Sequence, residues 1–404
     1  MKATRALALA LCLVACGDDA SGAGPSGPGP GSSSGGSSSG GGTIPSDGGG
    51  GGSDGGAPDA GARPTALHAL VGSGDGQIRV FRVDEATGDW TPKGAFAAGA
   101  SPSFLAADAA KGRVYAVDEG GAGAVLSFSF DPKTGALASL GAPAASPGSG
   151  PTHLSIDASG KWVLVGVYGA GKVGVFPIGA SGLAGAAVDV QSPGDKAHLA
   201  ITSPSGGYAF VPCLGSNLVA QFVFDAATGK LTPNPAGNAS PPPGSGPRHL
   251  DFQPGEAFAY GVNETASTLT TYAYDRTKGA LSPIETKTTL PAGYSGANTG
   301  AEVSVHPSGK WVYTSNRGHD SIAHFAIAPG TGKTTLVGHA PTGGKTPRSF
   351  AIDPKGSFLF AANQASDTVQ AFKLDPATGA PAALGAPRAV PKPTFVGLFA
   401  FETR

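Results

Sequence analysis

A unit of about fifty residues recurs along this chain and constrains its fold more than any other feature of the sequence. Each copy opens on a short stretch such as Pro-x-His-Leu, passes a Pro/Ser-x-Gly turn into an apolar strand, and closes a further strand with Asp-x-x-Thr-Gly. The openings recur every 45 to 53 residues, at Pro102, Pro151, Lys196, Pro247, Gly300 and Pro347. The Asp-to-Gly closings lie at 84–88, 131–135, 225–229, 275–279 and 375–379. Several short strands in each repeat of this length predict a β-propeller.

The ends of the repeat region predict the number of blades. Six copies begin between residues 101 and 346, and residues 67–99 hold a strand pair and a turn but no innermost strand. Residues 395–401 form a lone apolar strand after the last copy. We therefore predict an all-β, seven-bladed β-propeller closed by pairing of the C-terminal strand with the first blade. Such a ring leaves no free sheet edge, which would otherwise invite aggregation.

The N-terminus has the features of an export signal. Lys2 and Arg5 precede an apolar stretch over residues 6–14 that is too short to span a bilayer. Small residues then lead to Cys16, so the segment resembles a bacterial lipoprotein signal. We expect a signal peptide over 1–16 and lipidation of Cys16; the alternative is an ordinary secretory signal with a chance cysteine. The resemblance implies an exported protein anchored by lipid to a bacterial membrane, on its periplasmic face or at the cell surface.

The remainder divides into a tether and one domain. Residues 17–62 are almost entirely Gly, Ser, Pro, Asp and Ala, which cannot bury enough apolar surface to offset the entropy of ordering. We predict a disordered tether over 17–62 and the propeller over 63–404, expected to be a monomer. A net charge of −1 gives no basic footprint for nucleic acid.

Several kinds of chemistry lack support in the sequence. Cys213 is the single cysteine of 63–404, so no disulfide forms there, and we interpret it as a buried small residue rather than a nucleophile. No serine stands in Gly-x-Ser-x-Gly. The eight histidines show no close ligand spacing, and His319 with Asp320 is interpreted as a loop pair. We expect neither a metal nor a cofactor.

Aligning the repeats identifies positions that face the channel, because the start of each innermost strand and the end of the next strand lie together in an antiparallel hairpin. These positions collect ionisable side chains although only 14% of the chain is charged. The two columns of strand starts hold Ser103, Thr152, Ala197, Arg248, Ala301 and Arg348, then Phe104, His153, His198, His249, Glu302 and Ser349; the column of strand ends holds Ser73, Glu119, Tyr168, Leu214, Glu264, Arg317 and Gln364. Arg248, Arg317 and Arg348 predict an anion site, because the guanidinium fork suits carboxylate or phosphate. Repeated histidines such as His153 and His249 have a structural alternative, bonding a neighbouring blade's backbone.

Three runs in the second half carry a family resemblance. They are Gly246-Pro247-Arg248-His249 leading to Asn263-Glu264, Ala301-Glu302 leading to the run from Ser315 to Ile322, and Pro347-Arg348 leading to Ala362-Asn363-Gln364. With these runs the chain resembles the lactonase family of seven-bladed propellers, which includes bacterial 6-phosphogluconolactonases and the fungal carboxymuconate cyclase. The resemblance covers about residues 65–404 and is strongest over 246–380, so blades one to three are interpreted mainly as scaffold.

The resemblance implies a site of one histidine, two arginines and one glutamate. The matching positions here are His198, Arg248, Glu264 and Arg317, as catalytic residues, with His249, Glu302 and Arg348 as candidate substrate-binding residues. Two positions depart from the family: Lys196 replaces one of two paired histidines, and Cys213 replaces an aspartate that commonly follows the proline.

The resemblance implies a hydrolase that opens a lactone ring, 6-phosphogluconolactonase-like. Glu264 or His198 would be the general base that activates water, and Arg248 with Arg317 would hold the anionic group and the developing oxyanion. Because phosphogluconolactone is cytosolic and this chain carries an export signal, we expect a sugar lactone or another anionic lactone as substrate. The alternative is a non-enzymatic cell-surface propeller that binds an anionic ligand or a protein partner.

Overall fold

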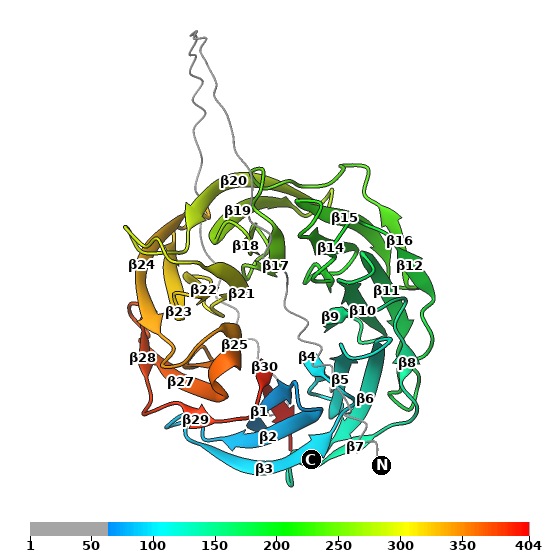
Figure 1. The fold of residues 1–404 in the computed structure, drawn as a ribbon. Helices are drawn as coiled ribbons and strands as arrows, with labels where there is room; N and C mark the ends of the chain where they lie inside the picture. Colours follow the sequence, from blue (N-terminus) through cyan, green and yellow to red (C-terminus); the bar gives the residue numbers. More distant parts are fainter. Residues whose placement is uncertain (1–63, 404) are drawn as a thin grey trace, which may run out of the picture. The chain divides into compact units, whose positions relative to one another are not determined.

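The computed structural model describes residues 64–403, which form seven antiparallel sheets arranged as blades around a central channel (Figure 1). The predicted seven-bladed β-propeller is therefore confirmed. The predicted signal peptide over 1–16, the lipidation of Cys16 and the tether over 17–62 lie outside the described residues. Within the described part of the chain, no helix has the length and apolarity needed to cross a bilayer.

Each blade runs outward from the channel as a meander of at least four strands. Blade one contains β30 (Pro393–Glu402), β1 (Thr65–Ser73), β2 (Gln77–Val83) and β3 (Trp90–Ala97); blade two contains β4 (Pro102–Asp108), β5 (Arg113–Asp118), β6 (Ala124–Phe130), β7 (Leu137–Ser139) and β8 (Ala144–Ala145). Blade three contains β9 (Pro151–Ile156), β10 (Trp162–Val167), β11 (Lys172–Pro177) and β12 (Asp189–Gln191); blade four contains β13 (Ile201–Thr202), β14 (Tyr208–Cys213), β15 (Leu218–Asp225) and β16 (Lys230–Pro233). Blade five contains β17 (Pro247–Phe252), β18 (Phe258–Asn263), β19 (Thr268–Asp275) and β20 (Ala280–Thr288); blade six contains β21 (Thr299–Val305), β22 (Trp311–Arg317), β23 (Ser321–Ile327) and β24 (Thr334–Pro341). Blade seven contains β25 (Pro347–Ile352), β26 (Phe358–Asn363), β27 (Thr368–Leu374), β28 (Pro381–Ala383) and β29 (Arg388–Ala389), with the short 3-10 helix η1 (Gln364–Ser366).

The C-terminal strand closes the ring, as predicted. β30 is the innermost strand of blade one and pairs antiparallel with β1 from Thr65 opposite Glu402 to Ser73 opposite Pro393. Red β30 and blue β1 therefore lie side by side in Figure 1. Phe401 of β30 is fully buried, and its ring packs on Phe130 of blade two. The first and last strands of the domain thus depend on each other for burial.

The Asp-to-Gly turns of the repeat join each blade to the blade before it. In the turn of blade four, Asp225 accepts hydrogen bonds from the Ala227 amide and the Thr228 hydroxyl, and Gly229 takes a φ of +73°. A Cβ on Gly229 would lie 2.6 Å from the ring of Trp162 in blade three, whose indole N–H donates to Ala226. Glycine is therefore required twice, for its conformation and for the close approach of an aromatic ring. The repeat encodes contacts between blades as well as turns.

The innermost strands begin with a β-bulge, which the sequence did not reveal. In blade five the register passes from Pro247–Asn263 to His249–Val262, so that Arg248 has no partner. The same shift occurs at the starts of β4, β9, β21 and β25. A bulge re-aims a side chain that regular alternation would send to the opposite face. Arg248 and His249 can therefore both reach the channel although they are adjacent in sequence.

Blade four departs from the expected strand at Lys196. On its inner side, β14 pairs regularly only with the two residues of β13 and has one isolated bridge, from Ala197 to Cys213. The physical reason is Pro212, whose carbonyl accepts from the His198 amide but which has no N–H to donate in return. His198 consequently lies in an irregular segment at the channel instead of in a strand.

Candidate active site

Three predicted site residues form a buried ion cluster. One oxygen of Glu264, Oε2, lies 3.0 Å from Arg248 Nε and 2.9 Å from Arg317 Nη2. Arg248 also donates to the Ala301 carbonyl, and Arg317 donates to the Gly300 carbonyl. Arg248 and Glu264 belong to blade five and Arg317 to blade six. One carboxylate therefore holds two arginines together at the channel.

The cluster retains donors that could serve a ligand. Within residues 64–403, the buried Nε groups of Arg248 and Arg317 lack a directed hydrogen bond, and so does Glu264 Oε2. The 3.0 Å approach of Arg248 Nε to Glu264 is thus a charge contact in which the N–H does not point at the oxygen. Buried unpaired donors are costly, so unpaired guanidinium N–H groups indicate a place for water or an anion.

Charge on these groups follows from their mutual contacts. Burial opposes ionisation of Glu264, but the charges of Arg317 and Arg248 outweigh it and hold the pKa of that carboxyl below its usual value. Burial, with repulsion from Arg317, lowers the pKa of Arg248 to about 10, which leaves it charged at neutral pH. Glu264 is consequently ionised at neutral pH and has a low affinity for a proton.

A second chain of contacts links three blades. Glu302 Oε1 lies 2.6 Å from His249 Nδ1, and His249 Nε2 lies 3.1 Å from His198 Nδ1. Burial, followed by the positive charge of Arg248, holds the pKa of both histidines well below the usual value. Both imidazoles are therefore neutral. Burial raises the pKa of Glu302 to about 8 although Arg248 acts in the opposite direction.

Arg348 forms an ion pair with Glu119, which the sequence placed in the column of strand ends without a role. Its Nη2 lies 3.3 Å from Glu119 Oε2, at the end of β5 in blade two. Phe104 of the same blade packs edge-on against His249, with 5.8 Å between ring centroids. Glu119 and Phe104 of blade two therefore also lie at the channel mouth, in contact with Arg348 of blade seven and His249 of blade five. The interpretation of blades one to three as mainly scaffold stays a prediction.

The alternative that a repeated histidine bonds the backbone of a neighbouring blade holds for His153 but not for His249. The His153 ring nitrogen Nδ1 accepts from the Ala200 amide of the neighbouring blade at 3.4 Å, as that alternative predicts. His249 bonds two ionisable side chains instead. Cys213 is fully buried and burial raises the pKa of its thiol to about 12, which confirms its interpretation as a small core residue.

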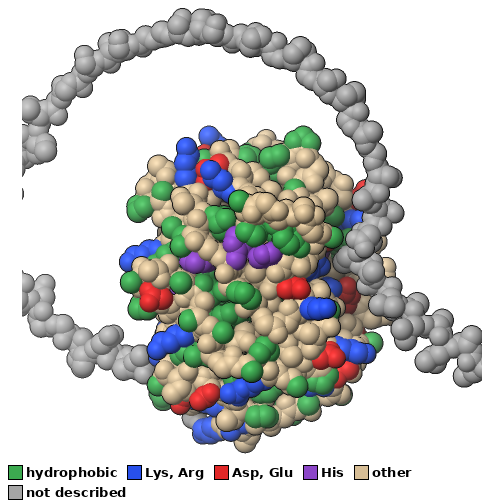
Figure 2. Space-filling view, turned by 60° about the vertical axis from the view of Figure 1, so that its left-hand side comes forward, with side chains coloured by type: hydrophobic (Ala, Val, Ile, Leu, Met, Phe, Trp, Pro, Cys, Tyr) green, Lys and Arg blue, Asp and Glu red, His purple; other side chains and the backbone are tan. Residues whose placement is uncertain are grey.

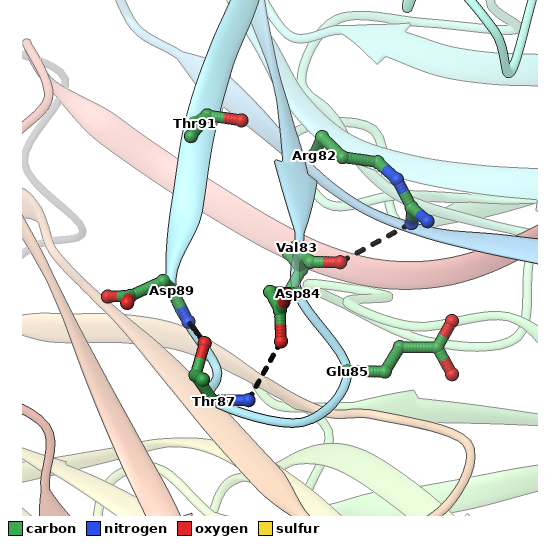
Figure 3. A pocket seen from close by; sticks show the side chains of 7 residues that line it. All are labelled: Arg82, Val83, Asp84, Glu85, Thr87, Asp89 and Thr91. Carbon is green, nitrogen blue, oxygen red and sulfur yellow. Dashed lines mark hydrogen bonds between the residues drawn. The ribbon is translucent and has the colours of Figure 1, made fainter.

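The site contains a small cavity of about 10 Å³. Its lining includes Arg248, His249, Glu302, Arg348 and the hydroxyl residues Ser103 and Thr394. That volume holds about one water molecule. A larger hollow of about 500 Å³ lies far out on blade one around the turn at Asp84 (Figure 3). Arg82, Asp84, Glu85 and Asp89 line this hollow, but Asp84 is used by the turn itself, where it accepts from the Thr87 amide.

Histidines also occur on the outer surface. In Figure 2 they gather near the middle of one face, where basic and acidic side chains are otherwise intermixed. On blade six, His319 and His339 lie with 5.3 Å between ring centroids, and each ring bonds a neighbour, Ser321 and Thr289 respectively. No group of three or more His, Cys, Asp or Glu side chains is placed to hold a metal ion in the part of the chain described, 64–403.

The family described as "Lactonase, 7-bladed beta-propeller" matches residues 68–398 of this chain. The chain belongs to this lactonase family. Among curated relatives, the 6-phosphogluconolactonase of Pectobacterium carotovorum subsp. carotovorum is 33% identical over 218 residues, 54% of this chain and 64% of the relative. That of Bacillus subtilis is 30% identical over 265 residues, 61% of this chain and 73% of the relative. The match to the Pectobacterium protein thus spans less than two thirds of its length.

A solved structure matches more of this chain. The periplasmic gluconolactonase of Pseudomonas aeruginosa is 29% identical, with a TM-score of 0.76, and the match covers 83% of this chain and 99% of that one. The two departures of this chain from the family pattern lie together in blade four. The ammonium group of Lys196, whose φ is +56°, lies 5.8 Å from the centre of the Tyr168 ring. Cys213 is fully buried and forms a β-bridge with the neighbouring Ala197.

Three asparagines that the sequence showed only as part of the family resemblance have a structural role. Asn263, Asn316 and Asn363 are fully buried at the ends of three second strands. Asn316 donates to the Thr289 carbonyl, and Asn363 donates to the Thr342 carbonyl. Asn263 donates to the hydroxyls of Thr268 and Thr270 in β19. These buried asparagines directly precede Glu264 in blade five and Arg317 in blade six. Their recurrence in Asn263-Glu264, Asn316-Arg317 and Asn363-Gln364 is the sequence signal from which a shared role could have been predicted.

Proposed function

We propose that this chain is a lactone hydrolase that opens the ring of an anionic lactone, such as a sugar lactone, outside the cytoplasm. The observation that carries the proposal is the pair Arg248 and Arg317, held by Glu264 with unpaired N–H donors and adjoining the neutral His198. Membership of the lactonase family and the 6-phosphogluconolactonase relatives support the same chemistry.

The two arginines would stabilise negative charge. Attack of water on the lactone carbonyl carbon converts the carbonyl oxygen to an oxyanion, and fixed positive charge in a buried site favours that state. Arg248 and Arg317 are both positioned before the substrate arrives, so no reorganisation is needed. Removing either guanidinium should cost on the order of 2–4 kcal/mol of transition-state stabilisation.

His198 is better suited than Glu264 to activate the water. The two arginines lower the pKa of Glu264, and its Oε2 already contacts both of them. The pKa of His198 is lowered too, but its ring is hydrogen-bonded through His249 to Glu302, which can take up the proton. His198 is neutral, and its contact to His249 uses Nδ1, which leaves Nε2 for a water molecule. In the reaction the water proton passes to His198, the new C–O bond forms, the ring C–O bond breaks, and the departing alkoxide takes up a proton.

The proposed location rests on the N-terminal signal in the sequence, and the periplasmic gluconolactonase of P. aeruginosa supports it. An exported lactonase would meet lactones other than a cytosolic phosphorylated intermediate. Fractionation of cells that express the full chain, with wild type and Cys16→Ser compared in membrane and soluble fractions, tests export and anchoring together.

The activity is tested with a panel of neutral, carboxylated and phosphorylated lactones on the purified protein. We expect turnover of at least one anionic lactone, and a loss of roughly 30- to 1000-fold in kcat/KM in Arg248→Ala and in Arg317→Ala. Binding of an anionic lactone without turnover would instead support the non-enzymatic cell-surface propeller. Wild-type rates in both arginine variants would overturn the assignment of the site.

A further inference from the structure

Glu302, His249 and His198 form a continuous hydrogen-bonded line across blades six, five and four. The line has two contacts, 2.6 Å from Glu302 Oε1 to His249 Nδ1 and 3.1 Å from His249 Nε2 to His198 Nδ1. All three side chains are buried, with 2–8% of each residue exposed. The line begins at a carboxyl group in the protein interior and ends at the ring that adjoins the arginine cluster.

Proton positions along this line are coupled, because a neutral imidazole carries one N–H and one bare nitrogen. If Glu302 is a carboxylate, His249 donates Nδ1–H to it, His198 donates Nδ1–H to His249 Nε2, and His198 Nε2 is bare. If Glu302 is protonated, its O–H points to His249 Nδ1, His249 donates from Nε2, and His198 carries its proton on Nε2. The state of Glu302 therefore decides whether His198 is a base or an acid.

Surrounding charge makes a positive His198 unfavourable. The positive charges of Arg248, Arg348 and Arg317 all lower the pKa of His198, in addition to its burial. A proton taken up at His198 Nε2 is therefore held poorly if it stays on that ring. Glu302 has the opposite preference: burial raises its pKa to about 8. Moving the proton to Glu302 leaves both rings neutral.

We propose that Glu302 is the proton reservoir of this site and works through His249 and His198. The inference rests on the proposed lactone hydrolysis. As water attacks, its proton passes to His198 Nε2, the Nδ1 proton of His198 passes to His249 Nε2, and the Nδ1 proton of His249 passes to Glu302. The carboxylate becomes a carboxylic acid, and no imidazolium remains. Reversal of the three transfers delivers the proton to the departing ring oxygen, so the relay is restored after one turnover.

Backbone and side-chain hydrogen bonds fix the position of Glu302. Its Oε1 accepts from the Val303 amide at 3.2 Å, and its own amide donates to Ser315 Oγ at 3.0 Å. The ionisable groups that face it are His249, Arg248, Arg348 and the buried Asp251, whose pKa burial raises to about 6. Glu302 also lines the cavity of about 10 Å³, which is large enough for one water. Glu302 acts through the two rings as a positioning residue.

The first test compares Glu302→Gln with wild type. Glutamine keeps the size and a hydrogen bond but cannot accept the relayed proton, so we expect kcat to fall about 100-fold with KM within about threefold. In wild type, kcat/KM should rise with pH through the ionisation of Glu302 near pH 8, because the carboxylate state gives the base form of His198. That rise should be absent in Glu302→Gln and restored, with a shifted midpoint, in Glu302→Asp. The matched control is Glu256→Gln, another buried glutamate, which bonds Ser205 outside the channel and should behave as wild type.

The second test needs no substrate. Nitrogen-15 NMR of the histidine rings in the free protein reports which nitrogen carries the proton. We expect His198 to change from Nε2–H to Nδ1–H as pH rises through about 8 in wild type, and to show no change in Glu302→Gln. A tautomer change without turnover of any lactone would uphold the relay and reject the proposed function. Two results would overturn the relay. One is a folded Glu302→Gln variant whose kcat/KM still rises with pH near 8 as in wild type; the other is a His198 tautomer change that is the same in wild type and in Glu302→Gln.

Discussion

Arg348 of blade seven and Glu119 of blade two form an ion pair of 3.3 Å that bridges the position of blade one at the channel mouth. The two residues are 229 positions apart, and only closure of the ring brings them together. Both side chains are mainly buried, with 13% and 24% exposed. The pair therefore moderates the positive charge of the anion site.

Neutralising Glu119 should increase the affinity of the site for anions. In Glu119→Gln, Arg348 loses its carboxylate partner and its charge becomes available to a substrate. We expect KM for an anionic lactone to fall about fivefold, or roughly 1 kcal/mol, while KM for a neutral lactone stays the same. Steady-state kinetics on a matched pair of lactones checks this. Equal changes for both substrates would show that Glu119 acts on shape and not on charge.

Removing Glu264 should destabilise the fold as well as the site. Glu264→Ala leaves Arg248 and Arg317 buried without their shared carboxylate, which we expect to cost about 3–5 kcal/mol in the free energy of unfolding. Glu264→Gln keeps the volume and an acceptor and should lose less. Denaturant unfolding of both variants measures the difference. Equal stability of Glu264→Ala and wild type would mean that the two arginines find other partners.

The same contact should appear in the pH dependence of stability. The folded pKa of Glu264 is lowered from the usual value of 4.5, so the folded state binds fewer protons than the unfolded state. Its contribution is therefore complete above about pH 4.5 and is lost as pH falls through the lowered folded pKa. The stability gap between wild type and Glu264→Gln should narrow over that acidic range. A gap independent of pH would contradict the linkage.

Gly229 and Gly237 offer a matched pair for the contact between blades. Both have positive φ, +73° and +80°, but a Cβ at 229 would meet Trp162 at 2.6 Å whereas a Cβ at 237 meets nothing within 4 Å. Gly237→Ala should cost only the backbone strain, about 1–2 kcal/mol. Gly229→Ala should cost a further 1–3 kcal/mol, roughly, because the Trp162 ring must move. Thermal unfolding of the two variants distinguishes strain from packing, and equal losses would refute the packing role.

The closing strand can be tested through its two phenylalanines. Phe401 is fully buried against Phe130, whereas Phe399 is partly exposed. We expect Phe401→Ala to destabilise the protein by about 3–5 kcal/mol, and Phe399→Ala by clearly less. Guanidinium unfolding followed by tryptophan fluorescence measures both. A small effect at Phe401 would show that the ring closes without help from its innermost strand.

Much of the fold was readable because it repeats. Turn residues at fixed intervals and alternating apolar strands are local signals, so they predicted seven blades and the pairing of the last strand with the first. Blade four was the exception. Pro212 has no N–H to complete the ladder, and His198 therefore lies in an irregular segment that regular alternation could not predict.

For the site, the sequence by itself determined which side chains reach the channel, since each stands in one of three columns of equivalent positions in the repeats. His198, Arg248, Glu264, Arg317, His249, Glu302 and Arg348 all lie there. Their partners were decided only by the tertiary structure. A bulge that depends on strand pairing brings neighbouring Arg248 and His249 to one site, and ring closure brings Glu119 to Arg348. The charges of Arg317 and Arg248 then keep Glu264 a carboxylate in spite of its burial, whereas burial favours the protonated form of Glu302. The pKa of a carboxyl group depends on the charges and water around it in space, which sequence distance does not measure.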